Sequence, residues 1–237
     1  MRKIKLKAMG KINLGLDVVR KREDGYHEVR MIMQTIRMYD QLQLLKREAP
    51  GIRVKTNLYY LPTNEDNLVY KAAKLLMDEF HIRQGLHIDL HKFIPVAAGM
   101  AGGSSDAAAV LVGMNRMFGL GLSRTQLMER GVKLGADIPY CIMRGTALAE
   151  GIGENLTRLE PVPCCHVLVA KPGIHVSTKF VYSNLKVSEL KTHPDIDGQI
   201  EAIKNRDLKG IAALMGNVLE TVTIPAYPVI QQIKDEM

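Results

Sequence analysis

The residues best suited to bind an anion lie between Pro95 and Ser105, where a loop of small side chains precedes an alanine-rich run. Glycine lets a backbone approach a ligand closely and adopt positive φ. The start of a helix exposes unpaired N–H groups and a partial positive charge of roughly +0.5. The segment therefore predicts a site for a triphosphate, at the start of a helix through 106–118 that Ser104 or Ser105 caps.

This loop departs from the two commonest phosphate-binding motifs. A P-loop needs a lysine directly after its last glycine, and Ser104 follows Gly103 instead. The G-x-G-x-x-G fingerprint of dinucleotide sites is also missing. An ordinary flexible loop ahead of a serine-capped helix therefore stays open as an alternative. The residues predicted to bind the nucleotide are Pro95, Val96, Ala97, Ala98, Gly99, Met100, Ala101, Gly102, Gly103, Ser104 and Ser105.

Two charged residues border apolar neighbours and could take part in acid–base chemistry. Asp137 lies between Ala136 and Ile138, just before Pro139, and is either a helix-end cap or a functional carboxylate. A carboxylate is a natural acceptor for the proton that an attacking hydroxyl loses. Lys11 ends a basic N-terminal strand, and taken alone it is typical of a solvated lysine.

A metal site is a weaker prediction. His87, Asp89 and His91 share one face of a predicted strand, which could suit a cation. A polar sheet surface explains this alternation better, so we predict no protein-bound metal.

Hydrophobic periodicity predicts the elements that must position these residues. The predicted strands are 12–19, 31–38, 41–45, 86–91 and 165–170. The predicted helices are 68–80, 106–118, one from the Ser123–Gln126 capping box to Gly135, 196–203, 211–218, and one from Pro228. Because strands and helices intermix, the predicted class is α+β, with two domains at 1–158 and 159–237 joined by a proline-punctuated seam.

Composition limits the function classes. The chain has 237 residues, of which 46% are apolar, and a net charge of +7. Its cysteines form no C-x-x-C pair, and no apolar run approaches the roughly 18 residues of a membrane span, so we expect free thiols in the cytoplasm. The positive charge permits nucleic-acid binding, but it is scattered and not interleaved with aromatic residues.

Three separated stretches carry a resemblance to a known superfamily. The segment 95–109 resembles the second motif of the GHMP kinases. The segments 8–14 and 24–27 are similar to the amino-terminal pattern of the branch that acts on a cytidine diphosphate-linked methylerythritol. The segments 135–139 and 145–154 resemble the catalytic region of the same branch, so the resemblance covers nearly the whole chain in order.

The resemblance implies a two-domain GHMP kinase fold, with an N-terminal ribosomal-protein-like domain and a C-terminal ferredoxin-like α/β sandwich. It implies ATP, with Mg²⁺ on its phosphates, as phosphoryl donor. It places Asp137 on the catalytic aspartate and Lys11 on the catalytic lysine that pairs with it. The reaction implied is phosphorylation of the 2-hydroxyl of the methylerythritol unit, in non-mevalonate isoprenoid synthesis.

The same resemblance places Tyr26 and His27 at the cytosine. Tyr182 or Phe180 could supply an opposite stacking ring, and Asn13 could contact polar groups of the substrate. The expected partners are therefore ATP and a small molecule, without nucleic acid or membrane, in a monomer or weak homodimer. A kinase for homoserine or mevalonate and a basic nucleic-acid-binding module are the alternatives.

The sequence departs from the superfamily pattern at two points. Ala101 stands where these kinases usually have glycine, which matters if the position needs positive φ. A third glycine-rich motif, usual near the C-terminus, does not appear before Met237. The resemblance therefore implies an incomplete C-terminal domain.

Overall fold

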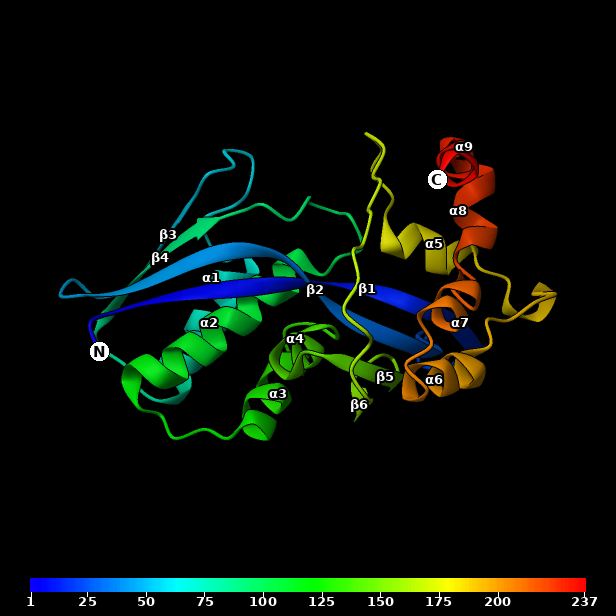
Figure 1. The fold of residues 1–237 in the computed structure, drawn as a ribbon. Helices are drawn as coiled ribbons and strands as arrows, with labels where there is room; N and C mark the ends of the chain where they lie inside the picture. The colour runs from blue at the N-terminus through cyan, green and yellow to red at the C-terminus, as the bar shows by residue number, and fades with distance from the viewer. The chain divides into compact units, whose positions relative to one another are not determined.

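The structure is a computed structural model that describes all residues, 1–237, and it divides into two compact units (Figure 1). Unit 1 comprises Met1–Ile12 and Thr35–Arg144, and unit 2 comprises Asn13–Gln34 and Gly145–Met237. Each unit is discontinuous because both strands of the N-terminal hairpin contribute to both units. A domain boundary at a single point of the chain stays a prediction.

The elements follow one another as a mixture of strands and helices. The strands are β1 (Lys3–Lys21), β2 (His27–Arg47), β3 (Ile52–Thr56), β4 (Gly85–His91), β5 (Thr146–Gly151), β6 (Asn155–Arg158) and β7 (Gly216–Asn217). The α-helices are α1 (Leu68–Glu79), α2 (Gly102–Phe118), α3 (Arg124–Val132), α4 (Ile138–Met143), α5 (Thr178–Asn184), α6 (Ile196–Lys204), α7 (Leu208–Ala213), α8 (Glu220–Ala226) and α9 (Val229–Glu236), with a 3₁₀ turn η1 at Val187–Glu189. None of these helices combines the length and apolar character that crossing a bilayer requires.

In unit 1 the strands lie in the order β3-β4-β2-β1. β4 runs antiparallel to β2, with Gln41 opposite His91 and Arg47 opposite Gly85, and β3 runs parallel to β4. The two strands predicted at 31–38 and 41–45 are one continuous strand. The polar residues between them interrupt the apolar pattern without interrupting the strand.

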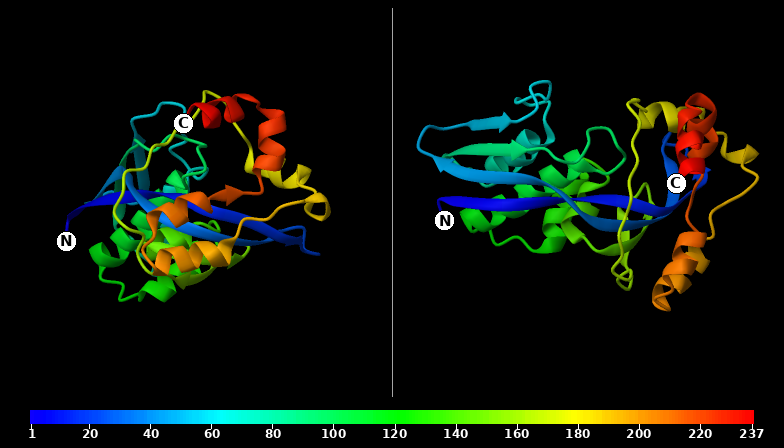
Figure 2. Two further views of the ribbon diagram at one scale, coloured as in Figure 1. Left: turned by 45° about the vertical axis from the view of Figure 1, so that its right-hand side comes forward. Right: turned by 45° about the horizontal axis from the view of Figure 1, so that its top comes forward.

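Helix α2 packs directly against the sheet of unit 1 and runs beside β1 in both views of Figure 2. A Cβ on Gly113 would lie 2.5 Å from a methyl carbon of Leu6 and 2.7 Å from one of Leu44, so only glycine permits this approach. The fully buried side chains around this contact are aliphatic, which explains how a chain without tryptophan builds its core. They include Leu42, Leu44, Leu76, Leu86, Ile88, Leu90, Ile94, Leu111 and Met114.

The predicted helix starts of unit 1 are confirmed where a side chain caps them. Asn67 accepts a hydrogen bond from the N–H of Val69 at the start of α1, and Ser123 with Gln126 forms the expected capping box of α3. Gly119 ends α2 at a φ of 66°, as predicted. The end of α3 was placed too late, because the helix stops at Val132, before Gly135.

In unit 2 the strands lie in the order β6-β5-β2-β1-β7. Helices α6 and α7 lie side by side, as Figures 1 and 2 show. The buried amide of Gln199 in α6 donates to the carbonyls of Leu14 on β1, at 3.3 Å, and Ile211 on α7, at 3.2 Å. This side chain therefore joins the helix pair to the strand.

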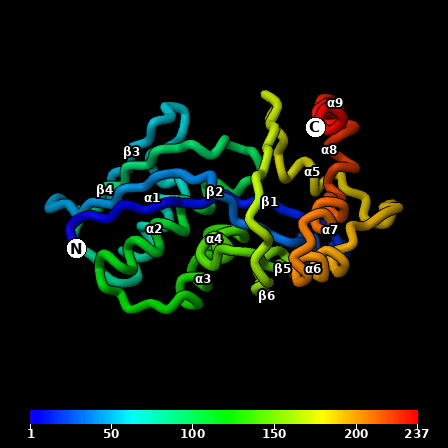
Figure 3. The backbone as a smooth tube through the Cα atoms, viewed as in Figure 1, coloured from blue at the N-terminus to red at the C-terminus, as the bar shows by residue number.

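Two predicted elements of unit 2 are wrong. Residues 165–170 form no strand and follow an extended, unpaired course, which the tube in Figure 3 traces. A strand needs a neighbouring backbone to satisfy its N–H and C=O groups, and no strand pairs here, so Leu168 remains 76% exposed despite its apolar sequence context. The helix predicted at 211–218 ends at Ala213, and Gly216 with Asn217 pairs with β1 instead.

Candidate functional site

The loop between β4 and α2 leads into a helix start whose first backbone N–H groups make no intrahelical bond. Helix α2 begins at Gly102, and its N-cap is Ala101, which makes no side-chain cap bond. Neither Ser104 nor Ser105 caps the helix, contrary to prediction, because both lie inside its first turn. The N–H groups of Gly102, Gly103 and Ser104 precede the first intrahelical bond, from Ser105 N to Ala101 O at 2.8 Å. These donors at the start of a 17-residue helix fit a phosphate group.

The backbone of the loop takes the left-handed conformation at three alternate positions. Ala97, Gly99 and Ala101 have φ values of 55°, 69° and 52°. This region costs a residue with a Cβ roughly 1–2 kcal/mol, so alanine is strained where glycine is not. The departure at Ala101 is therefore a strained substitution rather than a neutral one.

Two hydrogen bonds tie the loop to β1. The Ser105 hydroxyl donates to the Met9 carbonyl at 2.6 Å, and the Lys11 N–H donates to the Met100 carbonyl at 3.1 Å. Ser105 is buried and committed to this backbone contact. The half-buried hydroxyl of Ser104 is thus the better placed of the two serines to meet a ligand.

The structure brings together the two predicted catalytic residues, although they are far apart in sequence. Lys11 Nζ lies 3.9 Å from Asp137 Oδ1, with the lysine side chain 6% exposed and the aspartate side chain 35% exposed. Asp137 occupies the N-cap position of α4 but its side chain makes no cap bond. The helix-cap alternative for this carboxylate is therefore wrong, and the group stays accessible to a substrate.

Helix α4 is fixed so that Asp137 meets the lysine. The buried Tyr140 hydroxyl hydrogen-bonds with Thr35 Oγ1 on β2 at 3.0 Å. Gly131 of α3 allows close approach, since a Cβ there would lie 2.7 Å from Ile138 Cγ2. Burial, with the nearby carboxylate of Asp137, raises the pKa of the Cys141 thiol to about 12, so this cysteine is not a nucleophile near neutral pH.

A second lysine–carboxylate group lies buried near the loop, and the sequence analysis missed it. Lys92 Nζ contacts Asp40 Oδ2 and lies 2.7 Å from Asp106 Oδ2. The side chains of Lys92, Asp40 and Asp106 are 5%, 0% and 3% exposed. One signal was available: Asp106 is the only charged residue between Lys92 and Arg116.

The predicted base-binding residues lie in unit 2, after the turn of the hairpin. The Asp24 carboxylate accepts from the Tyr26 N–H at 3.0 Å and from the Arg22 guanidinium, which holds the pKa of Asp24 below its usual value. This bonding orders the turn, while the Tyr26 ring is 60% exposed.

His27 is buried and adjoins an aromatic ring. Its ring centroid lies 5.2 Å from that of Tyr182 on α5, at an interplanar angle of 42°. Its Nε2 is buried without a hydrogen-bond partner. Burial, followed by the charge of Lys21, lowers the pKa of His27, so the ring is neutral near pH 7. Phe180 is 41% exposed and makes no such ring contact. Of the two rival rings, the structure brings Tyr182 to His27.

The positions of Asn13 and of the histidines on β4 add little to the description of the site. Asn13 is half-buried on β1, two positions after Lys11. His91 Nε2 lies 3.5 Å from Asp89 Oδ1, and no group of three His, Cys, Asp or Glu side chains is arranged to hold a metal ion.

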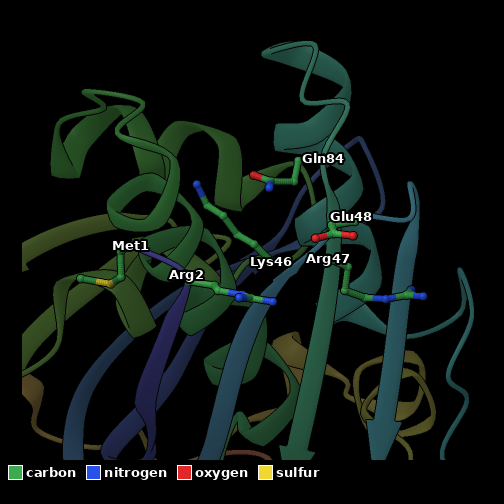
Figure 4. Close-up of a pocket in the computed structure, with 6 residues that line it drawn as sticks. All are labelled: Met1, Arg2, Lys46, Arg47, Glu48 and Gln84. Atoms are coloured by element: carbon green, nitrogen blue, oxygen red, sulfur yellow. The ribbon is translucent and has the colours of Figure 1, made fainter.

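A surface pocket in unit 1 holds none of the predicted residues (Figure 4). It lies beside Arg2, whose carbonyl accepts from the Lys46 N–H at 3.0 Å. Lys11 is the ninth residue after Arg2, and nine steps of a strand span about 30 Å at the usual rise per residue. Its lining residues are Met1, Arg2, Lys46, Arg47, Glu48 and Gln84.

Comparison with known proteins identifies the family. Residues 67–145 match the model of the GHMP kinases N terminal domain. The chain is 59% identical over 237 residues to a 4-diphosphocytidyl-2-C-methyl-D-erythritol kinase from Lachnospira eligens, and the match covers 100% of this chain and 82% of the relative. A kinase of the same name from Lachnoclostridium phytofermentans is 58% identical over 234 residues, which cover 99% of this chain and 80% of that relative.

Solved structures agree with this relationship. A crystal structure of 4-(cytidine 5'-diphospho)-2C-methyl-D-erythritol kinase superposes with a TM-score of 0.77 and 27% identity, covering 97% of this chain and 81% of that one. Homoserine kinase from Cytophaga hutchinsonii has a TM-score of 0.64 at 18% identity, covering 92% of this chain and 72% of that one, and shows the shared fold alone. The predicted α+β GHMP kinase fold is confirmed. The chain belongs to the 4-diphosphocytidyl-2-C-methyl-D-erythritol kinase family of the GHMP kinases.

Proposed function

We propose that the chain transfers the γ-phosphoryl group of ATP to the 2-hydroxyl of 4-diphosphocytidyl-2-C-methyl-D-erythritol, in non-mevalonate isoprenoid synthesis. The observation that carries this proposal is the pairing of Lys11 with the partly exposed Asp137, in the unit that also holds a helix start with unused N–H donors. The identity to kinases named for this substrate supports it.

Phosphoryl transfer depends mainly on positioning and charge neutralisation, which gives each residue a role. Asp137 accepts the proton of the attacking hydroxyl, because its carboxylate is partly exposed and makes no helix-cap bond. Lys11 pairs with this carboxylate and offsets charge on the transferring group. The N–H groups of Gly102, Gly103 and Ser104 hold phosphate oxygens.

Mg²⁺ belongs to this proposal as a companion of the nucleotide. When bound with the nucleotide, it would neutralise the charge that develops on the phosphates. Its binding does not require a cluster of protein ligands, because the nucleotide phosphates supply oxygens for it.

Recognition of cytosine is proposed for His27 and Tyr182. A base can stack against an aromatic ring, a contact worth about 1–3 kcal/mol. The neutral imidazole of His27 has one buried, unpartnered nitrogen, and a polar atom of a base would satisfy it. Tyr26 offers an exposed ring on the same hairpin, and Asn13 remains the candidate for polar groups of the substrate.

Substrate-dependent release of ADP tests the function. The protein is mixed with MgATP and either the cytidine diphosphate-linked substrate, homoserine or mevalonate. We expect release of ADP with the first compound only. Turnover with homoserine or mevalonate alone would assign another GHMP kinase activity, and no turnover with any of them by folded protein would overturn the proposal. The cytoplasmic location and the monomeric or weakly dimeric state remain part of the same proposal.

A further inference from the structure

Three buried charged side chains meet at the base of the phosphate loop, and the mechanism above does not use them. Lys92 Nζ contacts Asp40 Oδ2 and lies 2.7 Å from Asp106 Oδ2, with all three side chains at most 5% exposed. Burying charges is costly, and a stable fold keeps them only where they are paired. The cluster of Lys92, Asp40 and Asp106, called the loop clamp below, is therefore a feature whose role needs explanation.

The loop clamp joins the two ends of the phosphate loop. Lys92 comes three residues before Pro95, where the loop begins, and Asp106 directly follows Ser105, where it ends. Their contact, at 2.7 Å, thus joins the strand that enters the loop to the helix that leaves it. Fixing the two ends of a flexible segment reduces the conformations that the segment must lose when a ligand orders it.

Asp40 fixes the entering strand to β2. Its Oδ1 accepts hydrogen bonds from the N–H groups of Phe93, at 2.5 Å, and Ile94, at 2.8 Å. Its other oxygen contacts Lys92. One carboxylate therefore holds both the backbone before the loop and the ammonium that reaches across it.

The ammonium of Lys92 lies close to the turn that presents the phosphate donors. A Cβ on Gly102, the first residue of α2, would lie only 3.0 Å from Lys92 Nζ. Glycine at this position therefore allows the cluster to lie beside the helix start. The cluster therefore lies next to an N–H group that is proposed to hold a phosphate, where burial weakens the screening of charge.

We propose that the loop clamp positions the phosphate loop and that its net charge sets the affinity of the loop for a triphosphate. Lys92 and Asp106 are positioning residues in this proposal, since they act through the backbone of α2 and the loop. The inference rests on the proposed function, because it takes the ligand to be a nucleoside triphosphate.

The charge of the clamp depends on Asp106. Burial first, and then the neighbouring Asp40, raise the pKa of Asp106 to about 8, although Lys92 opposes the shift. Burial alone would lower the pKa of Lys92, but the two carboxylates raise it, so this lysine stays charged. The clamp is therefore neutral below about pH 8 and carries one negative charge above it. That charge repels phosphates, so affinity should fall as pH rises.

The ionisable groups that face Asp106 come from β2, from the residue after β4 and from α4. The residues that act on its charge are Asp40 of β2 and Lys92, which follows β4. From α4, the thiol of Cys141 has a pKa of about 12. Helix α1 packs against α2 with buried apolar side chains, those of Val69, Ala72, Ala73 and Leu76.

Calorimetric titration with MgATP tests the proposal directly, without turnover. The Kd is measured from about pH 7 to about pH 9.5, where the nucleotide phosphates keep their charge, for the wild-type chain, Asp106→Asn and the exposed control Asp78→Asn. We expect the wild-type and control Kd to rise by roughly three- to tenfold across the range, since one buried charge appears near the phosphates. Asp106→Asn should change by less than about twofold, because an amide keeps the contact with Lys92 and cannot ionise.

A second variant separates the contact from the charge. Asp106→Leu removes both, so its Kd should exceed the wild-type value at every pH and also be independent of pH. Should this variant fail to fold, the Asn variant alone decides the matter. A pH-independent Kd for the wild-type chain, or an Asp106→Asn profile that follows the wild-type rise, would overturn the inference alone. Absence of MgATP binding at every pH would overturn the proposed function, and the inference with it.

Discussion

Unit 1 contains two lysine–carboxylate groups near the same loop, each with a buried lysine, and they differ in the exposure and bonding of their carboxylates. Lys11 lies 3.9 Å from Asp137, whose side chain is 35% exposed and leaves the start of α4 uncapped. Lys92 instead contacts two carboxylates that are almost completely buried, and Asp40 also accepts two backbone N–H groups.

This difference suits the first group to proton transfer and the second to holding the fold in place. A carboxylate that is exposed and loosely paired can exchange a proton with a substrate at little structural cost. A buried pair cannot lose one partner without leaving an uncompensated charge, so its main effect is on stability and geometry. The five predictions below test this division, beginning with the largest expected effect.

Replacing Asp137 should remove chemistry and spare binding. Asp137→Asn should lower kcat by about 10²–10⁴-fold, the usual contribution of a general base, with the Kd for MgATP within about threefold of wild type. Coupled ADP release and calorimetric titration measure the two quantities, and Asp78→Asn on the exposed face of α1 serves as control. A variant with near-normal turnover would end the assignment of Asp137 as the base.

Replacing Lys92 should mainly lower the stability of the folded chain. Lys92→Met leaves the buried carboxylate of Asp40 without its counter-ion, so the free energy of unfolding should fall by about 3–5 kcal/mol. Urea denaturation followed by circular dichroism measures it. Lys55→Met, at an exposed position of β3, should change it by less than about 0.5 kcal/mol. Equal losses in both variants would contradict the distinction drawn here.

The pH dependence of stability sharpens the contrast. The folded chain raises the pKa of Asp106 from 3.8 to about 8, so between these values it binds a proton that the unfolded chain has lost. This residue therefore lowers stability as pH rises through that window. Asp106→Asn removes the effect, and its advantage over wild type should grow to a few kcal/mol from about pH 4 to about pH 8. Urea midpoints across this range measure the advantage, and a constant difference would contradict the raised pKa.

The contact between His27 and Tyr182 in unit 2 is a third case, because the buried Nε2 of His27 has no hydrogen-bond partner. Tyr182→Ala and His27→Ala should each raise KM for the cytidine diphosphate-linked substrate by roughly ten- to a hundredfold, through the loss of stacking and of the base contact. Phe180→Ala, which removes the rival ring, should raise KM by less than about threefold. Initial rates at varied substrate concentration decide between them, and a larger effect at Phe180 would transfer the role.

The smallest effect concerns the strained alanine of the loop. Ala101→Gly should raise the free energy of unfolding by about 0.5–1 kcal/mol, because it relieves a left-handed residue with φ of 52°. Ala98→Gly, in the same loop but without positive φ, should lower it by a similar amount through chain entropy. Thermal unfolding of both variants gives the sign, and the same sign in both would contradict the strain.

The candidate site was predicted unevenly from sequence. Periodicity and caps located α1, α2, α3, α6 and β4, since these signals are local. The resemblance supplied the pair Lys11 and Asp137, which spacing alone did not distinguish from a solvated lysine and a helix cap. The strand at 165–170 failed because its apolar residues say nothing about whether a neighbouring backbone exists to pair with them.

The loop clamp could not be predicted from the sequence for a related reason. Asp40 lies on β2, Lys92 follows β4, and Asp106 lies on α2, so nothing in their spacing predicts a common buried position. Only the antiparallel pairing of β2 with β4, and the packing of α2 against the sheet, bring the three side chains together.

The sequence by itself determined that a glycine-rich loop would lead into a helix, because glycine content and helix periodicity are properties of neighbouring residues. The tertiary structure alone decided which charges became accessible and which became buried. The reason is physical: the pKa and the reactivity of a carboxylate depend on the solvent and charges around it, and these come from distant parts of the chain. Asp137 and Asp106 have the same side chain, and the fold leaves the first 35% exposed beside Lys11 and the second 3% exposed beside Lys92.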